Sequence, residues 1–194
     1  MAKLTETREP MAFVDAAIAA FPVGRRAQGN EAVRALVDKV DDTYRQHLEG
    51  VYVGGEEVFI PDRLHFPNLK PALLDSLPLA ARCLVTRATD GHLRQAALRT
   101  ILNADEAWAI PFIILPIGEY VIEIIEDVRS ALPRLNRAAY VAFVGENVNM
   151  MRLLRARATS YWSCYYRFAF PERQDYPGLV VLDELDQWVR SELG

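Results

Sequence analysis

The fold is decided by residues 90–132, which read DGHLRQAALRTILNADEAWAIPFIILPIGEYVIEIIEDVRSAL. Apolar residues recur there at three- or four-residue intervals, as at Leu93, Ala97 and Ile101, which is the spacing of one face of a helix. Asp90 precedes the first run, where its carboxylate can accept hydrogen bonds from the first N–H groups of a helix. The stretch therefore predicts consecutive amphipathic helices that bury their apolar faces against one another.

Prolines, glycines and short polar runs divide this stretch into three helices. We expect Asp105 to cap a second helix that starts at Glu106, and Pro111 to bend that helix or shift its start. The second helix is apolar on nearly all sides, which is typical of an inner helix. A break at Gly118 then ends it, and Glu119 is predicted to open the third helix.

Two segments carry a resemblance to a known family. DGHLRQAAL (90–98), followed by AIPFIIL (109–115), resembles one HEAT-type helical repeat, in which an Asp-containing turn leads to a hydrophobic–Arg pair and small buried residues. GEYVIEII (118–125) resembles the start of a second repeat, offset so that Leu93 corresponds to Val121. The resemblance implies stacked antiparallel helices, an α-α superhelix.

The stretch departs from the HEAT-type pattern at residue 122 and in its number of repeats. Ile122 stands where Arg94 of the first repeat predicts a basic residue. A solenoid usually needs about three repeats, and two are visible here. An ordinary helical bundle would show the same pattern and is the alternative packing. Both predict a mainly α protein.

The remainder of the chain adds further helices and one exception. Residues 51–60 hold two β-rich triplets around a Gly-Gly pair, which predicts a small β-hairpin. Residues 179–182 are expected to form a strand or an extended run. Helices are predicted over 11–21, over 30–50 with Asn30 as cap, over 76–89 with Ser76 or Asp75 as cap, and over 147–167 and 183–193. Residues 138–144 are expected to form a short helix or a buried apolar segment.

The composition is that of an ordinary soluble globular protein, with 194 residues, 51% apolar and 25% charged. We predict a single helical domain, 1–194, in which 1–75 holds the N-terminal helices, hairpin and loop, and 76–194 the helical stack with an aromatic C-terminal cap. Cys83 and Cys164 are interpreted as buried thiols in a reducing compartment, so we expect a cytoplasmic protein. No membrane association is expected, because prolines and acids interrupt the most apolar window.

The strongest candidate surface is YWSCYYRFAFPERQDY (161–176), which holds seven aromatics in 16 residues. One interpretation is a stacking and cation–π surface for a nucleobase, a single strand of nucleic acid or a peptide. The other, which we favour, is a structural cap over the end of the helical stack. The candidate binding residues here are Trp162, Tyr166, Arg167 and Arg173, with Arg155 upstream.

The irregular loop 61–71 provides the second candidate, through Arg63 and His65. A pocket between this loop and the 161–176 aromatics would make the protein a small-molecule binder or an enzyme with a dispersed site. However, the three histidines are isolated, and GxSxG, GxGxxG and HExxH motifs are absent. We therefore expect no metal and no cofactor, and the sequence leans away from catalysis.

Charge is distributed unevenly along the chain. Residues 129–173 contain eight arginines and two glutamates, a balance of +6, so the remainder carries −10. Such asymmetry indicates either an anionic partner or internal pairing. A HEAT-like nucleic-acid-binding protein is the second alternative, and it ranks below the others because the net charge of −4 and the pI near 5.5 argue against binding to nucleic acid. The leading hypothesis is a non-catalytic protein–protein interaction module.

Overall fold

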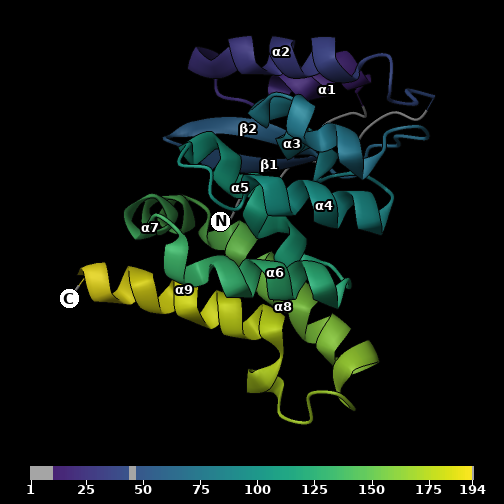
Figure 1. Ribbon diagram of the computed structural model, residues 1–194. Helices are drawn as coiled ribbons and strands as arrows, with labels where there is room; N and C mark the ends of the chain where they lie inside the picture. The colour runs from purple at the N-terminus through teal and green to yellow at the C-terminus, as the bar shows by residue number, and fades with distance from the viewer. Residues whose placement is uncertain (1–10, 44–46, 194) are drawn as a thin grey trace. The chain divides into compact units, whose positions relative to one another are not determined.

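A computed structural model describes residues 11–43 and 47–193 (Figure 1). The protein is mainly helical and has one small antiparallel sheet, so the predicted fold class is confirmed. The chain divides into two compact units, Met1–Ile101 and Leu102–Gly194. HEAT-like stacking and the single-domain organisation stay predictions.

The first unit combines short helices with the hairpin. Helix α1 packs on α2 and on strand β2, while α3 packs on α2 and α4. Its elements are α1 (Phe13–Ala19), the 3-10 turn η1 (Val23–Arg25), α2 (Arg26–Leu36), β1 (Leu48–Val53), β2 (Glu56–Pro61), the 3-10 helix η2 (Pro71–Ser76), α3 (Leu79–Val85) and α4 (Gly91–Ile101).

The hairpin forms where the sequence predicts it. Gly54 and Gly55 have φ angles of 60° and 81°, the conformation that a two-residue hairpin turn requires and that glycine adopts without strain. The strands pair from Val53 opposite Glu56 to Leu48 opposite Pro61. The hairpin confirms the predicted 51–60 segment and begins three residues earlier.

Helix α2 differs from its prediction at both ends. It begins at Arg26, so Asn30 lies inside it and is not its cap. It ends at Leu36, and Gly50, the predicted end, lies instead in strand β1. Tertiary hydrogen bonds hold the residues that follow α2. The Phe13 amide donates to the Asp42 carboxylate at 2.8 Å, and the Asp41 amide donates to the His65 carbonyl at 2.8 Å.

Asp90 caps α4 as predicted. Its carboxylate accepts hydrogen bonds from the amides of His92 at 2.8 Å and Leu93 at 3.3 Å. Arg94, buried within α4, donates to the Ala88 carbonyl at 2.6 Å and so ties the helix to the turn before it. By contrast, α3 has no side-chain cap, so the predicted Ser76 or Asp75 cap is wrong.

The described residues of the second unit form helices joined by short turns and irregular connections. Helix α9 packs against α6, α7 and α8 (Figure 1). Helix α8 also packs against η4. Its elements are η3 (Ala107–Ala109), α5 (Ile110–Ile114), η4 (Leu115–Gly118), α6 (Ile122–Ala131), η5 (Leu132–Arg134), α7 (Arg137–Glu146), α8 (Val148–Tyr161), the π-helix η6 (Trp162–Tyr166), η7 (Arg173–Asp175) and α9 (Pro177–Leu193).

Several helix starts in this unit differ from prediction. Pro111 shifts the start of α5 to Ile110, as expected, and the preceding 3-10 turn has no side-chain cap, so the cap at Asp105 is wrong. Helix α6 begins at Ile122, three residues after Glu119. Residues 179–182 are helical because α9 already starts at Pro177, and proline suits a first helical position.

Close packing between η4 and α8 explains why residue 118 is a glycine. A Cβ atom at Gly118 would lie 2.6 Å from the Leu154 side chain on α8. The absence of a side chain at residue 118 therefore lets η4 approach α8 closely.

We expect Asp90→Ala to lower the free energy of unfolding by about 1 kcal/mol, because the first turn of α4 loses its acceptor. Chemical denaturation measures the change. Asp90→Asn is the matched control and should retain most of the stability, since an asparagine oxygen can accept the same bonds. Equal losses in both variants would contradict the capping role.

Candidate functional site

The aromatic segment, residues 161–176, connects α8 to α9 (Figure 1). Its first part, Trp162–Tyr166, is a π-helix, a rare conformation that occurs frequently at functional sites. The Phe170 amide donates to the Tyr166 carbonyl at 2.8 Å, which closes the turn that follows. The aromatic side chains of this segment therefore lie on an irregular connection between two helices.

Three of the predicted site residues hold this connection together. The Trp162 indole donates to the Phe170 carbonyl at 2.8 Å, and the Arg167 guanidinium lies 5.1 Å from the centre of the Trp162 ring. Arg173 donates to the Thr159 hydroxyl at 3.1 Å. These contacts favour a structural role for Trp162, Arg167 and Arg173.

Tyr166, the fourth predicted residue of this segment, is half-buried. Its hydroxyl donates to the Tyr120 carbonyl, and its ring stacks on that of Tyr176 with centroids 5.4 Å apart. Burial raises the pKa of the Tyr166 hydroxyl, and the nearby Glu123 carboxylate raises it further. Tyr166 is therefore neutral at physiological pH and helps to anchor the segment to the residues before α6.

A different set of aromatic side chains faces solvent. Phe168 is fully exposed, and Tyr165 and Tyr120 are 70% and 56% exposed. The Tyr161 ring lies between two of them, with centroids 6.2 Å from Tyr165 and 6.1 Å from Tyr120. We call Tyr120, Tyr161, Tyr165 and Phe168 the aromatic surface.

Sequence reasoning located the segment, but the residues it selected there, Trp162, Tyr166, Arg167 and Arg173, all form contacts within the protein. It missed Tyr120, which comes from the residues before α6, because no local pattern links it to the segment. It also expected Cys164 to be buried, and this is wrong, since Cys164 is exposed on the π-helix, whereas Cys83 is buried as predicted.

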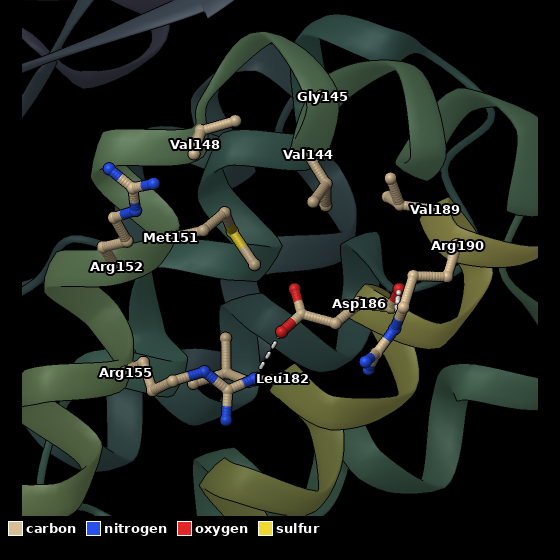
Figure 2. A pocket seen from close by; sticks show the side chains of 10 residues that line it. All are labelled: Val144, Gly145, Val148, Met151, Arg152, Arg155, Leu182, Asp186, Val189 and Arg190. Carbon is tan, nitrogen blue, oxygen red and sulfur yellow. Dashed lines mark hydrogen bonds and ion pairs between the residues drawn. The ribbon is translucent and has the colours of Figure 1, made fainter. Parts of the chain in front are cut away.

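A groove of about 360 Å³ lies between α7, α8 and α9 (Figure 2). Arg155, another predicted site residue, lies on its wall and donates to the carboxylates of Asp183 at 2.6 Å and Asp186 at 2.7 Å. Part of the basic segment is thus paired internally with α9. The groove is lined by Val144, Gly145, Val148, Met151, Arg152, Arg155, Leu182, Asp186, Val189 and Arg190.

Arg63 and His65 belong to the first unit, where both have local partners. Arg63 donates to the Asp62 carbonyl at 2.7 Å, and its guanidinium lies 3.6 Å from the Asp62 carboxylate. The His65 Nδ1 atom lies 2.9 Å from the Thr89 hydroxyl oxygen. The His65 contact joins the loop to the residues before α4, whereas the Arg63 contacts are within the loop. A role for either residue in binding stays a prediction.

Within residues 11–43 and 47–193, no group of three His, Cys, Asp or Glu side chains is arranged to hold a metal ion. None of the helices described for this chain is long and apolar enough to cross a membrane. No protein-family model, curated protein or solved structure matches the chain. The aromatic surface and the groove are therefore judged by their own geometry and chemistry.

Tyr176 provides a test of how the aromatic segment is anchored. Its ring is buried, and its hydroxyl has no hydrogen-bond partner among the described residues. Burial raises the pKa of this hydroxyl far above its ordinary value near 10. The folded protein consequently keeps the Tyr176 proton at pH values where the unfolded chain loses it, and stability falls as the pH rises past about 10.

We expect Tyr176→Phe to be at least as stable as the natural protein at pH 7, since the substitution removes an unpaired buried polar group. Above pH 10 its free energy of unfolding should fall less steeply with pH, because one ionisation of the unfolded state is gone. Urea denaturation at pH 8, 10 and 11 measures both effects. If the free energy of unfolding fell as steeply above pH 10 in Tyr176→Phe as in the natural protein, the assigned burial of the Tyr176 hydroxyl would be contradicted.

Proposed function

We propose that this protein is a non-catalytic protein–protein interaction module on a helical scaffold, and that its aromatic surface contacts the partner. The supporting observation is the exposure of Phe168 and Tyr165 beside the π-helix. Exposed apolar patches on soluble proteins mark interaction sites, and aromatic side chains are enriched among the residues that dominate binding energy. HEAT-like stacking, which the resemblance implies, is part of this proposal.

The inner contacts of the segment support the same role. Trp162 is bonded to the Phe170 carbonyl, and Arg173 is bonded to Thr159 on α8, so the turn is fastened at two points. A surface held in one conformation loses little entropy on binding. The structural cap and the binding surface are therefore two sides of one segment, with Trp162 within and Phe168 outside.

The chemistry of the surface favours a protein partner with an apolar anchor. Tyrosine and phenylalanine rings supply contact area at low conformational cost, and the tyrosine hydroxyls can satisfy polar groups around that anchor. Arg167 and Glu172 lie in the same segment and are exposed, so its charges are mixed in sign. Such a charge distribution gives little attraction for phosphate backbones.

We expect the double variant Tyr165→Ser/Phe168→Ser to keep its circular dichroism spectrum and its melting temperature within about 2 °C, because both side chains are exposed. It should bind the partner at least tenfold more weakly, as loss of a central aromatic contact costs more than 1 kcal/mol. The partner is identified by quantitative capture from cells that make the protein and is then purified for calorimetry.

The matched control for this test is Val23→Ser/Leu73→Ser, which changes two exposed apolar residues of the first unit. It should bind the purified partner with the same affinity as the unsubstituted protein. A partner whose affinity is unchanged by Tyr165→Ser/Phe168→Ser, or weakened equally by the control, would contradict the proposal.

Trp162→Ala should behave differently from the surface variant. It removes the bond to the Phe170 carbonyl and the ring beneath Arg167, so we expect a loss of about 2 kcal/mol in the free energy of unfolding. Thermal denaturation measures this loss. Unchanged stability would show that Trp162 is not part of the internal cap.

A further inference from the structure

We propose that the groove between α7, α8 and α9 binds a small molecule that has an apolar body and a single carboxylate, such as a medium-chain aliphatic acid. This site shares no residue with the aromatic surface and does not depend on the proposed function. Its volume of about 360 Å³ falls at the lower end of the range for small-molecule sites.

Apolar side chains from three helices form the greater part of the groove. Val144 comes from α7, Met151 from α8, and Leu182 from α9. Val148 also lines it and is 49% exposed, so apolar area here remains in contact with water. Covering this area with an aliphatic chain would be favourable, and the flexible Met151 side chain can adapt to its shape.

Gly145 adds to the space available in this groove. It lies near the end of α7, and a Cβ atom at this position would meet nothing within 4 Å. No neighbour requires a glycine here for close packing. The missing side chain therefore leaves one wall of the groove open.

The charged groups determine which head group fits. Arg155 is already engaged by Asp183 and Asp186. Arg152 and Arg190 are exposed, and neither forms an ion pair within the described part of the chain. The Nε atom of Arg190 donates to the Asp186 carbonyl at 3.3 Å. Figure 2 shows Arg152 and Arg190 on opposite sides of the groove.

Arg152, Arg155, Arg190 and Asp186 line the groove, and Asp183 lies outside the lining but pairs with Arg155, so these five groups together carry a net charge of +1. A single carboxylate balances that charge, and guanidinium groups bind carboxylates through strong charge-assisted hydrogen bonds. A doubly charged phosphate ester would instead leave excess negative charge beside Asp186. The charge balance therefore favours a monoanion with an apolar body.

Calorimetry and amide chemical shifts with octanoate as the probe test this site in the full chain. We expect saturable binding with a dissociation constant of roughly 0.1–1 mM, the range that suits a ligand of this size. The shift changes should concentrate in residues 144–155 and 182–190. Octanol and octylammonium, which have the same body without the carboxylate, should bind at least tenfold more weakly.

The double variant Arg152→Gln/Arg190→Gln should weaken octanoate binding at least tenfold. Arg134→Gln is the matched control, because this exposed arginine of the same unit lies outside the groove lining. Circular dichroism verifies that each variant is folded. Tyr165→Ser/Phe168→Ser should bind octanoate normally, so failure of one site is distinguishable from failure of the other.

Three results would overturn the inference. The first is no saturable octanoate binding below about 10 mM, a concentration at which even weak small-ligand sites fill. The second is equal binding of octanoate and octanol. The third is natural affinity in the folded Arg152→Gln/Arg190→Gln variant.

Discussion

The second unit depends on covering the apolar face of α9. Leu179, Leu182 and Leu185 are each 1% exposed, and this helix packs against α6, α7 and α8. Burying three leucines contributes about 6 kcal/mol, which is comparable with the whole stability of a domain. The partly exposed Arg155 ion pairs contribute less than about 1 kcal/mol, so apolar packing decides the position of α9 and the ion pairs refine it.

Both candidate binding surfaces follow from this packing. The chain must turn between α8 and α9, and the aromatic segment makes that turn, with its inner rings fastened and its outer rings in water. The groove exists because α7, α8 and α9 meet there without filling the space between them. One set of helix contacts thus supports both the aromatic surface and the groove, for which we propose a protein partner and a small carboxylate.

Local patterns predicted the elements better than they predicted the sites. Helical spacing located α4, α6 and α8, and a glycine pair located the hairpin. The end of α2 escaped prediction because the residues after it form hydrogen bonds with Phe13 and His65, which are distant in sequence. For the same reason the sequence identified Arg155 but not its partners, 28 and 31 residues away, and it identified Tyr166 but not Tyr120, 46 residues away.

The most direct test of the packing of α9 is native-state hydrogen exchange in Leu185→Ala, compared with the exposed change Gln187→Ala on the same helix. If α8 and α9 are stabilised by one shared core, the truncation should speed exchange in both helices by at least about tenfold, and the control should change neither. Faster exchange in α9 alone, with natural protection retained along α8, would contradict the account.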